Sequence, residues 1–319
     1  MRAFVTGITG FVGGHLAEHL IAAGDIVAGI STSGRWPRRL EHLARQARLD
    51  AADLVVADLV ETLRRKRPEA VYHLAARANP RRSLDDPHGA WVVNLVGTLN
   101  LLEAVRASGL NPRVLLVGSA ACYGRPAADS APIAETCPFR PETPYAASKA
   151  AADLLGLQHH LTYGAEIVRV HPFHHTGPRQ SPDYVLSDFA RRIVEIEHGR
   201  CDHLDVGNLE IVRDFSDVRD VVAAYRLLIQ HGCVGESYNL GGGVGTSLAV
   251  AVEMLRSEAR VSITVRVDPA RLRAGEPSRL VADARKLRAA TGWEPRRPLE
   301  STLADLLDDW RRFDLNSQL

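Results

Sequence analysis

Residues 6–13 read Thr6-Gly7-Ile8-Thr9-Gly10-Phe11-Val12-Gly13 and stand between two different hydrophobic patterns. The apolar run Ala3-Phe4-Val5 precedes them, as a buried strand would, and a helical stretch through Leu16 and Leu20 follows. Glycines at such a junction let the backbone approach a pyrophosphate, which the N–H groups and the dipole of a helix N-terminus stabilise. The spacing is Gly-x-x-Gly-x-x-Gly, so an ordinary tight turn is the alternative interpretation. We expect contacts to a dinucleotide from Gly7, Thr9, Gly10, Phe11, Val12 and Gly13.

Short apolar runs recur along the first half of the chain, and each precedes a loop and a helical pattern. They are Ile26-Val27-Ala28, Leu54-Val55-Val56, Ala70-Val71-Tyr72, Val114-Leu115-Leu116-Val117 and Ile167-Val168. This alternation predicts an α/β fold, a Rossmann-type doubly wound parallel sheet. After about residue 175, glycines punctuate shorter segments, which indicates a smaller C-terminal α/β substrate lobe. We predict a dinucleotide-binding domain at 1–170, with segments at about 211–240 as candidates to return to it, and a lobe at 171–319.

The composition restricts the classes of partner. The chain has 319 residues and a net charge of +1, without the basic excess that nucleic-acid binding requires. Its four cysteines include no Cys-x-x-Cys pair, which argues against a zinc cage and a disulfide framework and favours a reducing cytoplasm. No run of about 18 apolar residues occurs, so we expect neither secretion nor membrane insertion.

The end of the second predicted strand bears on the choice of cofactor. It reads Ser31-Thr32-Ser33-Gly34-Arg35 and lacks the acid that would bind a bare ribose. Hydroxyls and an arginine suit a 2′-phosphate, which favours NADP, with NAD as the alternative. Asp58 ends the third predicted strand, where it would face the adenine or cap a helix.

A candidate acid-base pair begins a predicted helix at Thr143-Pro144, with Thr143 as the N-cap. Tyr145 and Lys149 are four residues apart and therefore lie on one helical face. A tyrosine titrates near about 10 unless a positive charge stabilises its phenolate, and Lys149 would supply that charge. Ser119 ends another predicted strand, at the sheet edge where doubly wound folds place their chemistry. Each feature alone is typical of a solvated helix face or a helix cap.

Taken together, these motifs resemble the extended short-chain dehydrogenase/reductases. The resemblance rests on the glycine loop, His73-Leu74-Ala75-Ala76, the stretch from Asn94 to Glu103, Ser119 four residues before Tyr123-Gly124, and Tyr145 to Lys149. Within that family the chain looks most like the GDP-4-keto-6-deoxy-D-mannose reductases. That closer likeness rests on Val206 to Glu210, Arg213 to Asp220, Ser187 to Ala190 and Thr291 to Pro295.

The resemblance implies a nucleotide-sugar substrate and a homodimer built on helices near residues 90–107 and 144–160. It implies cofactor contacts at Asp58, Leu59, Leu74, Ala75, Ala76, Tyr145 and Lys149, besides the glycine loop, Ser31, Thr32 and Arg35. Substrate contacts are implied at Ser119, Ala120, His174, Arg179, Arg213, Arg273 and Glu276. Of these, Arg213 and Arg273 match positions that hold a diphosphate, and Glu276 one that holds a nucleotide ribose.

The chain departs from the family pattern at one loop. Related enzymes usually carry an arginine and an asparagine in an Arg-Pro-Phe-Asn-His pattern, where this chain has His171-Pro172-Phe173-His174-His175, and Arg179 replaces a common glycine. Three nearby histidines could suggest a metal site, but no carboxylate partner is evident and Pro172 breaks the spacing, so we expect no metal. Cys122 lacks an identifiable base and is interpreted as a packing residue.

The resulting hypothesis is an NAD(P)H-dependent reductase that acts on the 4-keto group of a nucleotide-linked 6-deoxyhexose, with Tyr145 as the acid, Ser119 orienting the carbonyl oxygen and Lys149 assisting. Its expected reaction converts GDP-4-keto-6-deoxy-D-mannose to GDP-D-rhamnose. A nucleotide-sugar 4-epimerase with retained NAD, and a non-catalytic dinucleotide-sensing protein, are the alternatives. A 4,6-dehydratase is disfavoured because Ala120, Ala121 and Cys122 follow Ser119, where resembling dehydratases place an acid.

Overall fold

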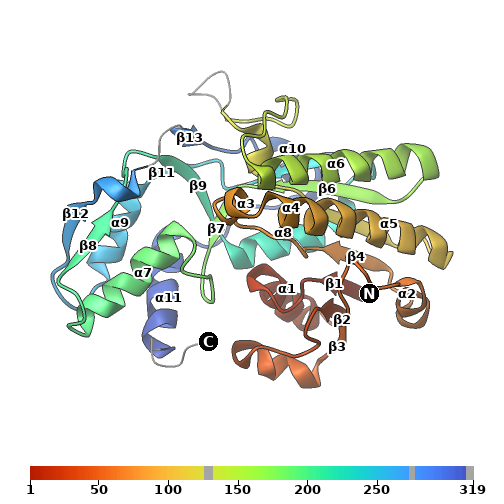
Figure 1. Cartoon of the computed structure of the whole chain (residues 1–319), viewed down its shortest axis with the longest axis horizontal. Coiled ribbons are helices and arrows are strands. Elements are labelled where there is room, and N and C mark those ends of the chain that lie inside the picture. The colour runs from red at the N-terminus through yellow and green to blue at the C-terminus, as the bar shows by residue number, and fades with distance from the viewer. Residues whose placement is uncertain (126–131, 273–276, 314–319) are drawn as a thin grey trace.

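The computed structural model describes residues 1–125, 132–272 and 277–313. Over these residues, parallel strands form a seven-stranded sheet in the order β10-β6-β5-β4-β1-β2-β3 (Figure 1). The strands are β1 (Arg2–Thr6), β2 (Ile26–Ser31), β3 (Ala47–Ala51), β4 (Ala70–His73), β5 (Arg113–Val117), β6 (Ile167–Pro172) and β10 (Ser237–Leu240). The chain moves from β1 to one edge and then from β4 to the other, so the sheet is doubly wound and the predicted fold class is confirmed.

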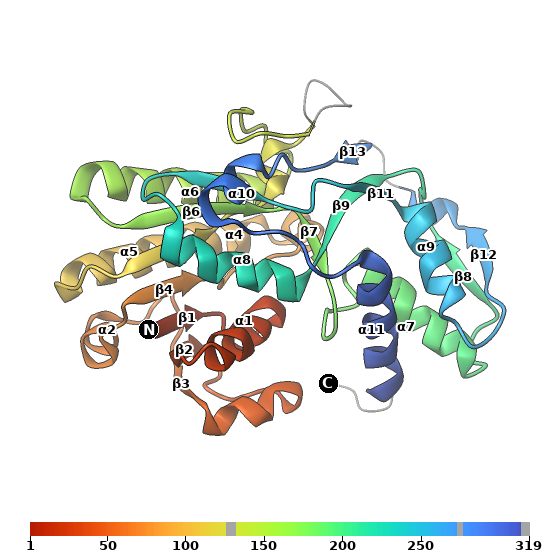
Figure 2. The same cartoon turned by 180° about the vertical axis from the view of Figure 1, so that it is seen from behind.

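Helices cover both faces of this sheet because successive strand residues point to opposite sides. Val5 of β1 belongs to the core under α1 (Phe11–Ala22) and α8 (Val218–His231), whereas Phe4 belongs to the core under α2 (Val60–Lys66) and α5 (Gly97–Ser108). Figure 1 shows α5 and α6 (Pro144–Tyr163) side by side on one face, and Figure 2 shows α1 and α8 on the other. Strands β1, β2, β4, β5 and β6 therefore contribute side chains to both cores.

Two predicted helices are observed close to their expected bounds. The crossover after β4 comprises α3 (Arg82–Asp85), α4 (Pro87–Trp91), a π-helical turn (Val92–Val96) and α5, which ends at Gly109 in the left-handed region with φ 73°. Helix α6 begins at Pro144, and the Thr143 hydroxyl accepts a hydrogen bond from the Ala146 amide at 3.1 Å, as an N-cap does.

The prediction of a third strand at Leu54-Val55-Val56 is wrong. These residues form a turn, and the strand is β3, whose sequence Ala-Arg-Leu-Asp-Ala has no continuous apolar run. The physical reason is position: β3 is the edge strand of the sheet, and an edge strand can expose polar side chains. Leu54 still packs into a core, but Val56 is 82% exposed.

The C-terminal lobe has its own small sheets and its own core. Strand β9 (Val212–Asp217) pairs with β7 (His174–Thr176), β11 (Gly245–Ser247) and β13 (Arg279–Leu280), while β8 (His203–Val206) pairs with β12 (Thr264–Val267). The core of this lobe is enclosed by helices α7 (Val185–Glu197), α9 (Leu248–Ser257) and α11 (Leu299–Arg312). Between these elements the chain returns to the large sheet through α8 and β10, and α10 (Arg285–Thr291) packs on α8. The residue bounds of the two domains stay a prediction.

No helix in the described part of the chain is both long enough and apolar enough to cross a membrane.

Candidate functional site

The glycine loop lies at the carboxyl end of β1 and opens α1. Gly7 has a φ of 71°, and a Cβ there would lie 2.8 Å from the Ala75 amide nitrogen. A Cβ on Gly13 would collide with the Gly7 carbonyl oxygen, so a side chain at either position would spread the turn. Gly10, at the N-cap, offers no side chain to the first amides of α1. The loop therefore fits the pyrophosphate of a dinucleotide, which those amides would bind.

The loop after β4 lies against the glycine loop. The Thr6 hydroxyl accepts a hydrogen bond from the Ala75 amide at 3.2 Å and lies 2.8 Å from Nδ1 of His73. Leu74, Ala75 and Ala76 therefore stand beside the glycine loop, at the point where the strand order reverses.

The end of β2 presents hydroxyls and a free guanidinium. Ser31 accepts a hydrogen bond from the Gly34 amide at 3.1 Å, and Ser33 accepts one from the Arg35 amide at 3.2 Å. Thr32 and Arg35 are exposed, and no side-chain partner of Arg35 occurs among the described residues. This arrangement leaves the guanidinium available to a phosphate group.

Two of the predicted cofactor-binding residues, Asp58 and Leu59, lie at the start of α2 and make contacts within the protein. Asp58 does not end the third strand; its Oδ1 accepts a hydrogen bond at 2.9 Å from the amide of Val60, the first residue of α2. Leu59 is buried in the core beneath α2 and α5. Any contact of these two residues with the adenine stays a prediction.

Ser119, Tyr145 and Lys149 meet where β5 ends beside the first turns of α6. Tyr145 and Lys149 are both buried, and Ser119 hydrogen-bonds the Tyr145 side chain. Burial raises the pKa of Tyr145 above its ordinary value, and the bond with Ser119 opposes this rise. Burial lowers the pKa of Lys149 to about 8, against the opposite influence of Cys122 and Asp153. At neutral pH the phenol therefore keeps its proton and the amine is mostly cationic.

Two polar residues that the sequence reasoning did not assign a role hold α6 in place. Asn94, in the π-helical turn, donates to the Ser148 hydroxyl at 2.9 Å and accepts from the Arg77 amide at 2.8 Å. Ser83 accepts a hydrogen bond from the Tyr145 amide at 3.1 Å. The signal available for Asn94 was an asparagine within the apolar run from Val92 to Val96, because an amide that such a run buries needs partners.

Two of the predicted substrate residues come together in the small sheet. His174 of β7 is exposed to solvent and lies edge-on to Phe215, its neighbour in register, with 5.8 Å between ring centroids. The neighbouring Arg213 and His175 lower the pKa of His174, so its ring is neutral beside the buried Arg213. Ala120 follows Ser119 and is buried. Arg273 and Glu276 lie outside the described residues.

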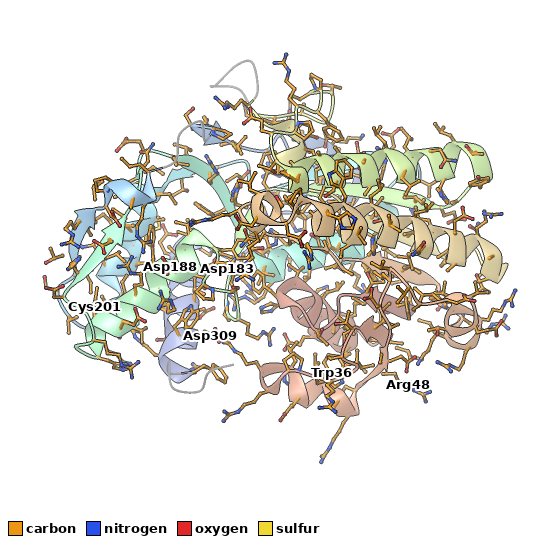
Figure 3. All side chains as sticks on the ribbon, viewed as in Figure 1. Trp36, Arg48, Asp183, Asp188, Cys201 and Asp309 are labelled. Carbon is orange, nitrogen blue, oxygen red and sulfur yellow. The ribbon has the colours of Figure 1, made fainter. Side chains whose placement is uncertain are left out.

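Arg179 is placed apart from this group. Its guanidinium binds both carboxylate oxygens of Glu18 at 2.6 Å, and Nη2 lies 2.8 Å from His15 Nδ1, both on α1. Its amide donates to Asp309 of α11, which Figure 3 shows between the two lobes. Arg179 lines a cavity of about 590 Å³ between α1, α8 and α11. Its predicted contact with substrate therefore has no support in these side-chain contacts.

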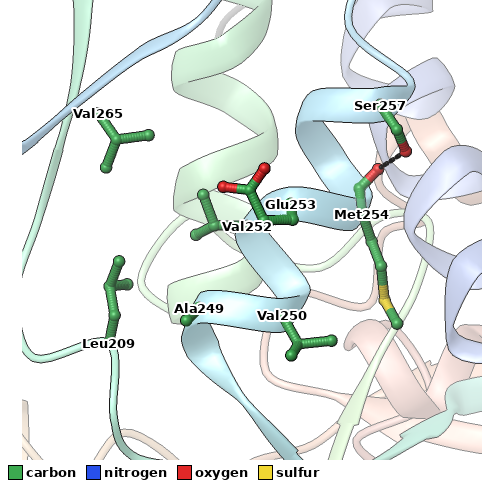
Figure 4. A pocket seen from close by; sticks show the side chains of 8 residues that line it. All are labelled: Leu209, Ala249, Val250, Val252, Glu253, Met254, Ser257 and Val265. Carbon is green, nitrogen blue, oxygen red and sulfur yellow. Dashed lines mark hydrogen bonds between the residues drawn. The ribbon is translucent and has the colours of Figure 1, made fainter.

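A second cavity, of about 620 Å³, lies on α9, and none of the predicted site residues lines it (Figure 4). Its walls are mostly apolar, with Glu253 and Ser257 as the polar exceptions. It therefore offers no cluster of groups for hydride or proton transfer.

Cys122 is fully buried, and burial raises the pKa of its thiol to about 12, as expected of a packing residue. Within the described ranges, histidine, cysteine, aspartate and glutamate form no group of three or more that could hold a metal ion.

Comparison with known families now identifies the group to which the chain is related. Residues 4–306 match the family model described as GDP-mannose 4,6 dehydratase. The chain belongs to this family. The GDP-6-deoxy-D-mannose reductase of Pseudomonas aeruginosa is 36% identical over 97% of both chains. The UDP-glucose 4-epimerase of Mycolicibacterium smegmatis is 32% identical over 98% of this chain and 99% of its own length.

Solved structures agree in fold along nearly the whole chain. RMD from Pseudomonas aeruginosa, complexed with NADPH, superposes with a TM-score of 0.85 and 33% identity over 98% of this chain and 99% of its own. The resemblance to the extended short-chain dehydrogenase/reductases, and within them to the GDP-4-keto-6-deoxy-D-mannose reductases, is confirmed.

Proposed function

We propose that this protein is an NADPH-dependent reductase that converts GDP-4-keto-6-deoxy-D-mannose to GDP-D-rhamnose. The observation that carries this proposal is the buried contact of Ser119 with Tyr145 one turn before Lys149, at the sheet edge that holds the glycine loop. The similarity to the Pseudomonas aeruginosa reductase and to its NADPH complex supports the substrate and the cofactor.

When bound, the dinucleotide supplies a hydride to C4 of the sugar. Ser119 donates a hydrogen bond to the carbonyl oxygen and orients it. Tyr145, which holds its proton at neutral pH, gives that proton to the alkoxide that develops on this oxygen. Lys149, as a buried cation, offsets the negative charge that then remains on the phenolate.

The residues after Ser119 disfavour the elimination of water, although the matching family model is named for a dehydratase. Dehydratases that the chain resembles carry an acid directly after the serine, and here Ala120, Ala121 and Cys122 stand there. The Cys122 thiol, with a pKa near 12 and no exposure, cannot replace that acid. The side chains at this position therefore favour reduction.

We infer that Arg213 binds the diphosphate of the substrate and that the neutral His174 beside it offers a hydrogen bond. Their proximity and the solvent exposure of His174 support this inference. Arg273 and Glu276 are proposed from the resemblance to contact the diphosphate and the nucleotide ribose.

The test is the variant Tyr145→Phe, assayed by NADPH oxidation with the GDP-linked 4-keto sugar. It should bind NADPH almost as the parent does and lose most turnover, because only the proton donor is removed. Cys137→Ser, a partly exposed cysteine outside the catalytic group, is the matched control. Undiminished reduction by the Tyr145 variant would refute the assignment.

The similarity to a UDP-glucose 4-epimerase makes epimerisation the second candidate. An epimerase keeps its NAD bound and regenerates it within each cycle. The absence of an acid at Ser31 to Ser33 argues for exchange with a free NADPH pool instead. Protein that purifies with stoichiometric NAD and epimerises without added reductant would establish the alternative.

We also propose a homodimer built on α5 and α6. Large apolar side chains are exposed on these helices and on α4: Trp91, Leu99, Leu154, Leu161 and Tyr163. Light scattering after gel filtration should give a dimer for the parent and a monomer for Leu161→Glu, because burying a charge at such an interface is unfavourable. Val267→Glu, at an exposed valine on β12 of the C-terminal lobe, should stay dimeric. A monomeric parent would refute this proposal.

We place the enzyme in the cytoplasm, since all four cysteines are free thiols.

A further inference from the structure

Asp153 extends the catalytic face of α6 by one more turn beyond Tyr145 and Lys149. Its side chain is 2% exposed and accepts hydrogen bonds from Arg169 Nη1 at 2.6 Å and from His171 Nε2 at 2.8 Å. Burial alone would raise the pKa of Asp153, but His171 and Arg169 lower it below its ordinary value. The carboxylate is therefore ionised and acts only as an acceptor, so Nε2 of His171 must carry a proton.

The other ring nitrogen of His171 faces a hydroxyl oxygen. Nδ1 lies 3.1 Å from the Tyr123 hydroxyl, and this hydroxyl donates its proton to Asn239 Oδ1 at 2.8 Å. The orientation of the Asn239 amide is set by its Nδ2, which donates to the Ile133 carbonyl at 2.7 Å. Because a tyrosine has only one proton to donate, its oxygen accepts from Nδ1. This arrangement gives each ring nitrogen of His171 an oxygen that can accept a hydrogen bond.

The ring of His171 also lies against the segment that holds Ser119. A Cβ on Gly118, the residue before Ser119, would lie 2.7 Å from His171 Cδ2. Tyr123, at the other end of the turn that Ser119 caps, meets the ring edge-on with 5.7 Å between centroids. The imidazole thus contacts both ends of the turn and, through Asp153, the catalytic helix.

We propose that His171 is an imidazolium and a positioning residue, which joins Asp153 on α6 to Gly118 and Tyr123 around Ser119. This inference rests on the proposed function, whose acid and orienting hydroxyl are the groups so joined. Related enzymes carry an arginine at this position, and a doubly protonated histidine keeps both its positive charge and its capacity to donate two hydrogen bonds. The departure from the family pattern at His171 therefore conserves the chemistry of the site.

The charge of His171 also affects Lys149. Asp153 raises the pKa of Lys149, and His171 together with Arg169 counters the charge of Asp153. A neutral residue at position 171 would leave that carboxylate less compensated, so the pKa of Lys149 would rise from about 8. The titratable and polar groups packed around His171 and its partners are Asp153 and Lys149 on α6, Arg169 on β6, Cys122 and Tyr123 after Ser119, Asn239 on β10, and Glu135.

The first test reads protonation directly and does not depend on activity. Nitrogen NMR of the protein labelled at its histidines, at pH 7.5, should show both ring nitrogens of His171 protonated, with His171→Gln identifying its signals. His174, assigned through His174→Gln, should show one protonated and one unprotonated nitrogen, because its pKa lies near 3. A neutral tautomer at His171 would overturn the proposal, whatever reaction the enzyme performs.

The second test measures positioning. His171→Gln should lower kcat for the 4-keto sugar by roughly tenfold or more, because Ser119 and Tyr145 lose the side chain that positions both of them. The KM for NADPH should stay within about twofold, because the glycine loop does not contact His171. The alkaline limb of the kcat profile should move to higher pH. His171→Arg should restore kcat and return the limb, since it restores the charge and the donors.

His159→Gln is the matched control, because His159 is a buried histidine on α6, the helix that carries Asp153, and it faces Glu103 instead. An unchanged kcat and pH limb in His171→Gln, or an arginine variant no better than the glutamine variant, would overturn the positioning role. If His171→Gln fails to fold, Tyr123→Phe tests the same link by removing the acceptor of Nδ1. A parent protein that reduces no 4-keto sugar would instead refute the proposed function, and the NMR result would still decide the charge of His171.

Discussion

Arg179 occupies a backbone conformation that suits glycine, the residue that related enzymes commonly have there. Its φ is 73°, and an L-residue in this left-handed region is strained by about 1–2 kcal/mol. The bidentate pair with Glu18 and the contact with His15 offset that strain. These contacts join the loop after β7 to the helix that begins at the glycine loop, so we expect them to stabilise the junction of the two lobes.

Two substitutions separate the strain from the ion pair. The side chains of Arg179 and Glu18 are 16% and 32% exposed, so the charged hydrogen bonds, discounted for solvent screening, contribute about 2 kcal/mol. Arg179→Ala loses this contribution and keeps the strain, which gives a destabilisation of about 2 kcal/mol. Arg179→Gly also loses the ion pair, but it relieves the backbone strain. Part of that gain is offset because glycine gives the unfolded chain more conformational freedom, so this variant should be destabilised by only about 1 kcal/mol.

Scanning calorimetry would measure this difference as melting temperatures. For a chain of this size, about 1 kcal/mol corresponds to roughly 2 °C, so the alanine variant should melt roughly 2 °C below the glycine variant. Gly164→Ala calibrates the backbone contribution, because Gly164 has a φ of 69° and open space around a Cβ. A glycine variant that melts with or below the alanine variant would refute the argument that Arg179 is strained.

Three further outcomes follow from charge and burial. Burial and Arg179 lower the pKa of His15 to about 4, so the folded state binds fewer protons than the unfolded state. The free energy of unfolding should therefore fall by about 3 kcal/mol as the pH drops from 6.5 to 4. Urea unfolding at several pH values should show this loss, and His15→Gln should remove it. Because catalysis needs the cationic Lys149, kcat/KM for the 4-keto sugar should fall as pH rises through about 8, and a flat profile to pH 10 would contradict this role. Ser31→Asp should weaken NADPH more than NADH, because a carboxylate repels the 2′-phosphate and accepts from a bare ribose; a parent with kcat/KM for NADH at least equal to that for NADPH would contradict the predicted preference.

Local pattern was sufficient for the elements whose signals are strong and short in range. The helix at Thr143-Pro144 and the strand at Val114 to Val117 appear where capping and a continuous apolar run predict them. The third strand was missed because an edge strand has few buried side chains, so its sequence carries little periodic signal. Leu54 and Val55 gave a stronger but misleading signal, since one buried leucine in a turn looks the same as one in a strand.

The sequence alone was enough to predict the glycine turn between β1 and α1 and the shared helical face of Tyr145 and Lys149, because a strand-to-helix turn and residues four apart on a helix depend only on near neighbours. It was also enough to show that His171 and Arg179 depart from the family pattern. Only the tertiary structure decided what those two residues do, since Asp153, Tyr123 and Glu18 are brought to them from distant parts of the chain. A hydrogen-bond partner, and with it a side chain's charge, is set by which atoms the fold places within about 3 Å, and no local spacing contains that information.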